Sequence, residues 1–304
     1  MQPIEAAILR TVLYGDVFDF PMTAAEIHHF LIHDQPVKRT TVDDTLNKSQ
    51  ALAQHLILDQ TYIACHGREA LIDLRRAREA HTRQVWDDAI MYGHWLAWLP
   101  FVRMVALTGA LAMRNDSAGA DYDYMLITAP GRVWLARAFA IALVRVCKLR
   151  GVTICPNYVL AADVLEQTRN DIYIAHEIAQ MIPIYGDESY HALRSCNVWT
   201  AHHLPNANQP FHTQESEPKA RLPHTLKRLA EILLSGRIGD MLDSWEHRRK
   251  LKRFEADLQT PGSSAQLDRS QVKGHFNDYG HKVINAYEDR LAQYGLEQLP
   301  LAGD

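Results

Sequence analysis

The chain has 304 residues and a formal net charge of −4, and 47% of its residues are hydrophobic while 22% are charged. This length supports a full hydrophobic core and about two domains, and the composition is that of an ordinary globular protein. The small negative charge excludes a global basic field that would concentrate nucleic acid, so any such contact would have to be local.

Residues 1–67 predict a small helical unit that ends in a hairpin. The expected elements are a helix over 4–14, a second from the capping box Thr23-Ala24-Ala25-Glu26 to about 32, a third from Thr41, and strands over 55–58 and 61–64. Asp59-Gln60 is the expected two-residue turn of the hairpin. Three helices followed by a hairpin are the order of a winged helix-turn-helix, so we expect a winged-helix-like module.

Residues 68–196 predict an α/β unit with a small sheet. The expected elements are a long or broken helix over 68–98, strands over 102–107 and 122–128, a helix over 133–149, a strand over 152–160 and a helix over 170–181. Pro156 lies within the last of these strands, which indicates an edge or a bulge.

Residues 197–304 predict an irregular connection followed by helices. The expected order is a connection over 197–223, helical sequence over 225–258, a linker at 260–264 and a last helix over 276–294. The loop at 274–280 mixes glycine with polar and aromatic residues and is a candidate lining for an acceptor pocket. The fold class expected for the whole chain is α+β, with a small mixed sheet flanked by the N-terminal module and C-terminal helices.

Cysteine spacing and apolar segments indicate the compartment. The four cysteines form no Cys-x-x-Cys pair, which suits a reducing interior, and the N-terminus lacks the features of a signal peptide. The longest apolar stretch, 133–146, is interrupted by Arg137 and Arg145 and is too short and too charged to span a bilayer. We therefore expect a cytoplasmic protein without membrane contact.

Two acids at the start of the strand over 122–128 predict a metal site. Asp121 and Asp123 are two residues apart, so both carboxylates point to one face of the strand, where they can hold Mg²⁺. Gly109 follows the preceding strand, and with Thr108 it would shape a turn whose backbone N–H groups approach a phosphate closely. Arg114 belongs to a polar loop expected to lie over this site.

These residues resemble a known family. A strand, Gly-Ser, about ten residues and Asp-x-Asp within an apolar strand are the signature of the DNA polymerase β-like nucleotidyltransferases, which include the aminoglycoside and minimal nucleotidyltransferases. The resemblance covers residues 102 to about 160 of the 304. It implies a small mixed sheet with helices on one side, a phosphate turn at Gly109 and Ala110, Mg²⁺ or Mn²⁺ on Asp121 and Asp123, and a nucleoside triphosphate substrate.

The chain departs from the family pattern at two points. Ala110 stands where the family usually has a serine that helps to hold a phosphate. The family's third acid lies on a later strand, and the matching strand, 155–160, has none. Asn157 could supply one neutral oxygen to the metal, and Asp163 or Glu177 could substitute for the acid, with Glu177 as general base.

The predicted function is transfer of a nucleoside monophosphate to a hydroxyl, phosphate or protein side chain, an EC 2.7.7-type reaction. A non-catalytic nucleotide sensor is the first alternative, and a DNA-binding regulator with a scaffold α/β unit is the second. The third helix carries Asp43 and Asp44 against Lys48, which favours packing or homodimer formation by the module over DNA binding.

Two further motifs support weaker functional interpretations. His176-Glu177 nearly begins a zinc-protease helix, but Gln180 replaces the second histidine, so we expect no zinc. The basic run 248–253, beside Trp245 and Phe254, could clamp a polyphosphate or an RNA backbone, although a solvated helix face is its commoner meaning.

Overall fold

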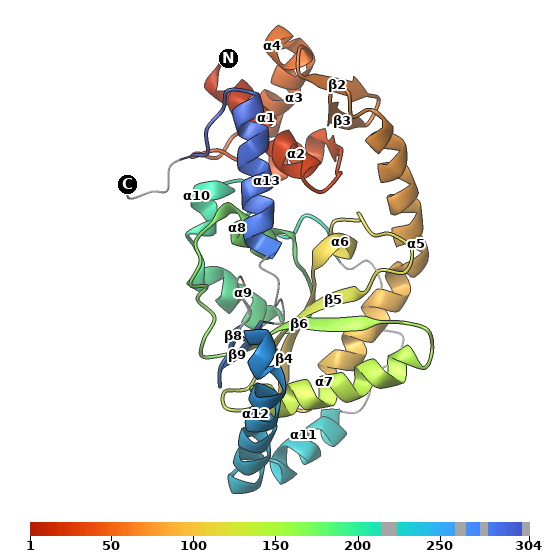
Figure 1. Ribbon diagram of the computed structural model, residues 1–304, viewed down its shortest axis with the longest axis vertical. Coiled ribbons are helices and arrows are strands. Elements are labelled where there is room, and N and C mark those ends of the chain that lie inside the picture. The colour runs from red at the N-terminus through yellow and green to blue at the C-terminus, as the bar shows by residue number, and fades with distance from the viewer. Residues whose placement is uncertain (214–223, 259–265, 274–278, 300–304) are drawn as a thin grey trace.

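The computed structural model describes residues 1–213, 224–258, 266–273 and 279–299. It is a mixed α+β structure with two small sheets, of strand order β1-β3-β2 and β7-β4-β5-β6-β9-β8. The three-stranded sheet belongs to an N-terminal unit at one end of the molecule, and the six-stranded sheet lies in the middle (Figure 1). The predicted linker at 260–264 and most of the predicted loop at 274–280 lie outside the described residues.

The N-terminal unit contains the three helices and the hairpin that the sequence predicts, together with two short elements, β1 and α4, that it does not. Its elements are α1 (Pro3–Asp16), β1 (Met22–Thr23), α2 (Ala24–His29), α3 (Arg39–Lys48), α4 (Gln50–Ala53), β2 (Leu56–Asp59) and β3 (Tyr62–Cys65). The capping box is present, since the Thr23 hydroxyl accepts from the Glu26 N–H and the Glu26 carboxylate accepts from the Thr23 N–H. The two-residue strand β1, which pairs with β3, is too short to carry a periodic signal and was not expected.

One continuous helix, α5 (Ala70–Ala97), connects the N-terminal unit to the central sheet. It runs down one side of the molecule and is drawn in orange in Figure 1. The helix ends just before the Leu99-Pro100 pair, close to the end that the sequence predicts. None of the described helices is both long and apolar enough to cross a lipid bilayer.

The central sheet combines parallel and antiparallel pairs. Its strands and intervening helices are β4 (Val102–Leu107), α6 (Gly109–Ala112), β5 (Tyr122–Thr128), α7 (Val133–Lys148), β6 (Ile154–Ala161), α8 (Ile172–Gln180) and β7 (Ile182–Tyr185). β5 pairs with β6 in parallel and with β4 antiparallel, so the sheet is mixed, as predicted. The strand β7 was missed because Pro183 within it resembles a stop; it pairs at the sheet edge, where proline is tolerated.

The described C-terminal part consists of helices, an irregular stretch over 204–213 and a short hairpin. Its elements are α9 (Asp187–Cys196), α10 (Thr200–His203), α11 (His224–Leu233), α12 (Arg237–Leu258), β8 (Gln266–Leu267), β9 (Gln271–Lys273) and α13 (Tyr279–Gln293). β9 extends the central sheet by pairing with β6, a contact distant in sequence that local patterns do not predict. The predicted helical stretch 225–258 is divided into α11 and α12, with Gly236 at the break in a left-handed conformation at φ 72°.

Helices cover both faces of the central sheet, so the expectation of helices on one side is wrong. Along β5, Tyr124 and Leu126 pack towards α5 and α7, whereas Met125 and Ile127 pack towards α8 and α9. Asp123 has the same parity as Met125 and therefore lies on the α8 face. The position of α8 thus determines what the acid pair faces.

The helix α8 is buried between the sheet and the N-terminal unit. Ile174 and Ile178 belong to the core against the sheet. Ala175 and Ala179, on another side of the helix, join a second core that contains residues of α1, α2 and α13. The N-terminal unit is therefore held close to the α8 face of the sheet, where Asp123 lies.

Candidate functional site

The acid pair lies at the start of β5. Asp121 is exposed immediately before the strand, and Asp123 is partly buried as its second residue. Burial, together with repulsion from the neighbouring Asp121 carboxylate, raises the pKa of Asp123 to about 7. The cysteine thiol of Cys155 lowers this pKa by hydrogen bonding to the carboxylate. The two carboxylates repel each other, and neither has a cation among its described partners. A bound divalent cation would relieve this repulsion.

Gly109 packs directly against Asp123. Its φ is 67°, and a Cβ at this position would lie 2.7 Å from Oδ2 of Asp123. The Thr108 N–H donates to the Asp123 carbonyl at 2.9 Å, and Ala110 is exposed as the next residue of α6. The turn that was predicted for phosphate contact is therefore adjacent to the acid pair, and it requires glycine both for its backbone conformation and for space.

Asn157 lies at a bulge in β6 and contacts Asp123. The parallel register pairs Tyr124 with Pro156 and Met125 with Tyr158, which leaves Asn157 as the extra residue. Its Nδ2 donates to Oδ1 of Asp123 at 3.3 Å. The bulge that Pro156 suggested is therefore confirmed. Its consequence for the site is that an amide side chain is directed at the acid pair.

Glu177 reaches the same place from α8. Its pKa is raised to about 7, first by burial and then by the negative charge of Asp123, while Lys273 and the hydrogen bond from Gln180 act in the opposite direction. The Gln180 Nε2 donates to Oε1 of Glu177 at 2.7 Å. Glu177 therefore lies within electrostatic reach of Asp123.

A cavity of about 300 Å³ connects these residues. One wall belongs to the sheet and α8 and includes Gly109, Ala110, Asp123, Asn157 and Glu177. The opposite wall belongs to the N-terminal unit and is aromatic and apolar, with Tyr14, Phe18, Phe20, Met22 and Phe30. Sequence reasoning missed this second wall, because nothing in the spacing of 14–30 indicates that it faces residue 123.

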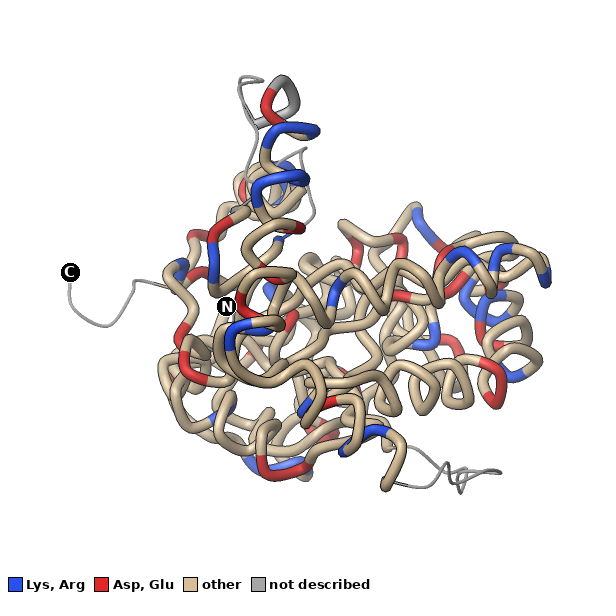
Figure 2. Tube along the Cα trace, turned by 90° about the horizontal axis from the view of Figure 1, so that it is seen from below, with Lys and Arg blue, Asp and Glu red and all other residues tan. Residues whose placement is uncertain are grey.

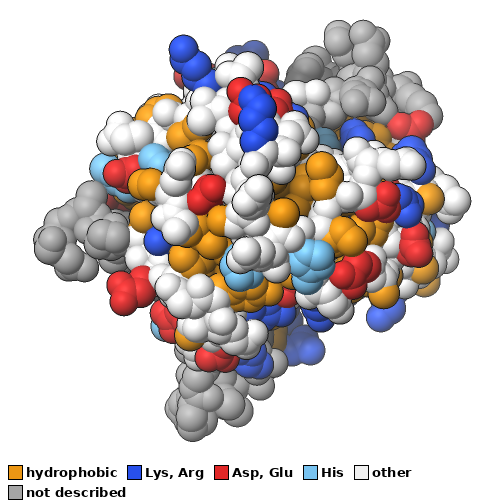
Figure 3. Space-filling view, turned by 90° about the horizontal axis from the view of Figure 1, so that it is seen from above, with side chains coloured by type: hydrophobic (Ala, Val, Ile, Leu, Met, Phe, Trp, Pro, Cys, Tyr) orange, Lys and Arg blue, Asp and Glu red, His pale blue; other side chains and the backbone are white. Residues whose placement is uncertain are grey.

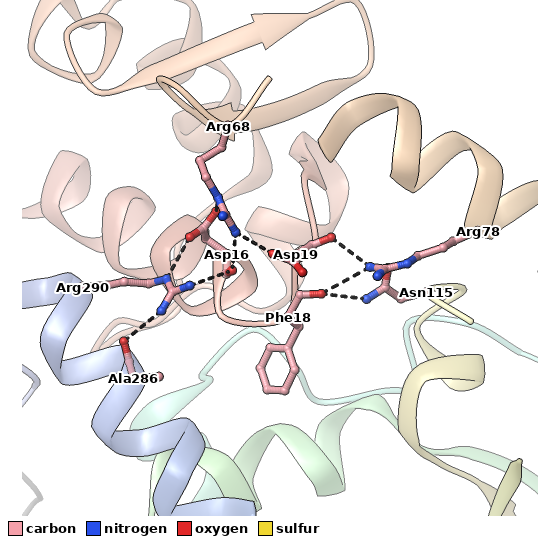
Figure 4. Close-up of polar contacts among 8 residues, drawn as sticks. All are labelled: Asp16, Phe18, Asp19, Arg68, Arg78, Asn115, Ala286 and Arg290. Carbon is pink, nitrogen blue, oxygen red and sulfur yellow. Dashed lines mark hydrogen bonds and ion pairs between the residues drawn. The ribbon is translucent and has the colours of Figure 1, made fainter. Parts of the chain in front are cut away.

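Arginines of α5 fix the loops that border the cavity (Figure 4). Arg78 donates to the carbonyls of Phe18 and Asp19 and to Oδ1 of Asn115, and Asn115 donates in turn to the Phe18 carbonyl at 3.1 Å. Arg75 donates to the Met113 carbonyl at 2.9 Å. The α1–β1 turn and the loop after α6 are therefore attached to the same helix, which holds the two walls in one relative position.

Three predicted site residues do not line this cavity, namely Asp121, Asp163 and Arg114. Asp163 is exposed beyond the end of β6 and does not line the cavity. The Arg114 guanidinium lies over the Trp86 ring of α5, 5.5 Å from its centroid, and also does not line the cavity. Arg114 was expected to cover the site, but its left-handed backbone, with φ 53°, turns the chain towards α5 instead.

A smaller neighbouring cavity of about 60 Å³ shares part of this wall. Asn157, Tyr173, Glu177 and Tyr279 line both cavities, and the smaller one adds Thr108, Arg169 and Lys273. Cationic side chains are thus present near Glu177, with Arg169 paired to Asp171 at 2.7 Å. Such cations are the groups that stabilise phosphate oxygens.

The donor set fits a hard divalent cation that keeps most of its ligands from water and substrate. Within the described ranges there is no group of three or more His, Cys, Asp or Glu side chains that could hold a metal alone. Mg²⁺ is usually held by one or two carboxylates together with waters and phosphate oxygens. Asp123 and the neighbouring Asp121 are the carboxylates that could serve here, and the Asn157 amide faces Asp123 with its nitrogen.

Comparison with known proteins finds no matching family model, no matching curated protein and no matching solved structure. The functional inference therefore rests on the geometry of the site.

Proposed function

We propose that the protein is a metal-dependent nucleotidyltransferase of the DNA polymerase β-like type, with its core at β4–β6 and a winged-helix-like N-terminal unit. One observation supports this activity most directly. Asp123, beside the Gly109 turn, shares a cavity with Asn157 and Glu177, which come from two other elements. Acids, an amide and a glycine turn converging on a cavity are what phosphoryl chemistry on a nucleotide requires.

Each group has a role in this proposal. Asp121, Asp123 and Asn157 would hold Mg²⁺ or Mn²⁺, and the Thr108-Gly109-Ala110 turn would border the phosphates. The bound cation would offset the negative charge that develops at the α-phosphoryl group. The aromatic wall of the N-terminal unit would receive an uncharged, flat part of a substrate, because the lining described on that side carries no lysine or arginine.

The reaction forms one bond and breaks one. An acceptor oxygen attacks the α-phosphorus in line, the bond from that phosphorus to the bridging oxygen of the β-phosphate breaks, and pyrophosphate leaves. The acceptor proton passes to the Glu177 carboxylate. A pKa near 7 suits this group to act as a general base at neutral pH.

Pyrophosphate release tests the proposal. Purified protein with Mg²⁺ or Mn²⁺ is incubated with each nucleoside triphosphate, labelled at the α-phosphate, and with small-molecule and protein fractions of a cell extract. We expect label transfer and pyrophosphate release that Asp123→Asn abolishes and that Asp163→Asn, a matched exposed acid outside the cavity, leaves unchanged. Transfer that survives Asp123→Asn would refute the assignment.

A nucleotide sensor is the second candidate. It is favoured by a cavity that has walls from both the N-terminal unit and the sheet, so that a bound nucleotide would contact both. Ala110, in place of the family's serine, also points in this direction. In that case the labelled nucleotide binds in the presence of Mg²⁺ without any pyrophosphate release.

The DNA-binding alternative has less support. On α3, Arg39 pairs with Asp43 at 2.8 Å and Lys48 pairs with Asp44 at 2.7 Å, so acids neutralise its cations. On the face of the molecule at this end, acidic and basic side chains are interspersed with apolar ones (Figure 3). DNA binding that Lys38→Glu with Arg39→Glu weakens, and Asp121→Asn with Asp123→Asn does not, would revive this alternative.

A further inference from the structure

The helix α11 is attached to the body by its polar side. Oε1 of Glu231 accepts from the Phe101 N–H at 2.6 Å and from Arg103 at 2.7 Å. Nζ of Lys227 donates to the carbonyls of Ala97 and Val102, at 2.8 and 2.7 Å. An ordinary surface helix buries its apolar side and exposes its polar one. Here the main anchoring contacts are polar.

The opposite side of α11 is apolar and exposed. Leu226, Leu229, Ile232 and Leu233 are each more than half exposed, at 61%, 56%, 59% and 73%. On the next helix, α12, Ile238, Met241 and Trp245 are exposed at 59%, 61% and 54%. These seven residues are close to half of the fifteen large hydrophobic side chains that are exposed in the described part of the chain, although they span only residues 226–245. Clustering of this kind marks an interaction surface.

The exposed stripe of α12 changes from apolar to basic along the helix. Arg248 and Lys252 follow Ile238, Met241 and Trp245 at helical spacing, so they continue the same face. Both basic residues are exposed, and Arg249 lies beside them over the Trp245 ring, 5.3 Å from its centroid. Seen from below, α12 projects from the body and carries a succession of lysines and arginines (Figure 2). A chain of net charge −4 thus presents cations on the same helix face as exposed apolar side chains.

We propose that this surface, formed by the outward side of α11 and the exposed stripe of α12, binds the surface of an anionic lipid bilayer. Leucine, isoleucine and tryptophan side chains at a helix surface enter the boundary between headgroups and acyl chains, while flanking arginine and lysine contact anionic headgroups. A symmetric contact with a second copy through this surface would bring the basic stretches of both copies together, whereas an anionic bilayer complements both the apolar and the basic parts. The surface lies at the end of the molecule away from the N-terminal unit (Figure 1), so binding leaves that unit exposed.

Vesicle flotation with the full chain tests this proposal. Vesicles of phosphatidylcholine alone are compared with vesicles that contain about 30% phosphatidylglycerol, at low and at high salt. We expect the protein to float with the anionic vesicles only and to be released by salt. Arg248→Glu with Lys252→Glu, and separately Leu229→Ser with Ile232→Ser, should each weaken binding by about tenfold or more.

Matched variants keep the test specific. Lys38→Glu with Lys282→Glu makes the same charge change on exposed lysines of the N-terminal unit and α13, and Leu58→Ser changes an exposed leucine of β2. These controls should float like the unaltered protein, and circular dichroism should show every variant folded. The proposal is overturned if anionic vesicles do not bind the protein, or if controls and surface variants lose binding equally. A dimer in sedimentation that Leu229→Ser with Ile232→Ser dissociates, without vesicle binding, would show that the surface contacts a second copy instead.

Discussion

The Asn157 amide donates to the Asp123 carboxylate at 3.3 Å from the bulge in β6, the strand on which the proposed nucleotidyltransferase resemblance would place an acid. The amide thus contacts the acid pair without adding a third charge. In the absence of a cation a third carboxylate would be costly here, because Asp123 already has a raised pKa from burial and from Asp121. The neutral residue is therefore compatible with a folded protein whose metal arrives with its substrate.

Asn157→Asp is expected to have opposite effects without and with metal. Without divalent cations, the added carboxylate should lower the melting temperature at pH 8 by several degrees, because like charges are brought together. With millimolar Mn²⁺ or Mg²⁺, the variant should recover this loss and bind the cation more tightly than the unaltered protein. Differential scanning calorimetry with and without metal measures both effects. A loss of stability that metal does not restore would contradict the site.

The pH dependence of stability follows from the two raised carboxyl pKa values. Asp123 and Glu177 both rise to about 7 in the folded protein, from ordinary values of 3.8 and 4.5, mainly through burial. Between about pH 4 and pH 7 the folded state therefore binds more protons than the unfolded state. The stability that the two carboxyl groups contribute is full below about pH 4 and is lost as the pH rises through about 7. Thermal unfolding of metal-free protein should show this decline, and Asp123→Asn should flatten it.

Metal binding should have the reverse pH dependence. Because a carboxylate must lose its proton before it coordinates a cation, Mg²⁺-dependent nucleotide affinity should increase by about tenfold or more between pH 6 and pH 8. Titration calorimetry at the two pH values measures this change. An affinity that does not vary with pH would show that Asp123 takes no part in binding the cation.

Glu177→Gln tests whether Glu177 acts as a general base or as a ligand of the metal. If Glu177 accepts the acceptor proton, the variant should bind nucleotide with nearly unchanged affinity while kcat falls by about a hundredfold or more. The rise of kcat/KM with pH through about 7 should also be lost. The matched change Glu188→Gln, at an exposed glutamate of α9, should alter neither quantity. A loss of nucleotide affinity as large as the loss of kcat would instead assign Glu177 to the binding of metal or substrate.

The sequence predicted the local elements of the site better than its surroundings. Asp121, Asp123 and Gly109 are adjacent in space because a strand, a turn and a strand are local in sequence, and the period of two in β5 determines which side Asp123 takes. Glu177 was only one of two substitutes predicted for the missing acid, since its place depends on how α8 packs. The aromatic wall from Tyr14 to Phe30 depends on contacts between distant segments, for which one sequence carries no local signal.

Gly109→Ala tests whether the turn and the acid pair are coupled. The new Cβ would lie 2.7 Å from Oδ2 of Asp123, and φ is 67°. Gly131→Ala is a matched control, because φ there is 68° and no atom lies within 4 Å of the added Cβ. Both variants carry the left-handed backbone cost of about 1–2 kcal/mol. Only Gly109→Ala should lose more stability than this and also lose metal-dependent nucleotide binding. Equal effects on binding would show that the acid pair does not depend on this turn.

Arg75 should be among the most sensitive positions outside the site. Its side chain is 1% exposed, pairs with the buried Glu26 of α2 at 2.8 Å and with Glu79 at 2.7 Å, and lies over the Phe20 ring. Arg75→Met leaves Glu26 buried without its cation, which should cost about 3–5 kcal/mol of unfolding free energy. The neighbouring Arg76 pairs with Asp59 and Asp73 at the surface, so Arg76→Met should leave the free energy of unfolding nearly unchanged.

Urea unfolding measures both changes, and a second substitution identifies the cause. Burial raises the pKa of Glu26 even with Arg75 present, so adding Glu26→Gln to Arg75→Met removes the stranded charge and should restore part of the lost stability. Because Arg75 also donates to the Met113 carbonyl beside the cavity, the double variant should still bind nucleotide more weakly than the unaltered protein. If the double variant recovered binding completely, the contact from α5 to this loop would have no role in shaping the cavity.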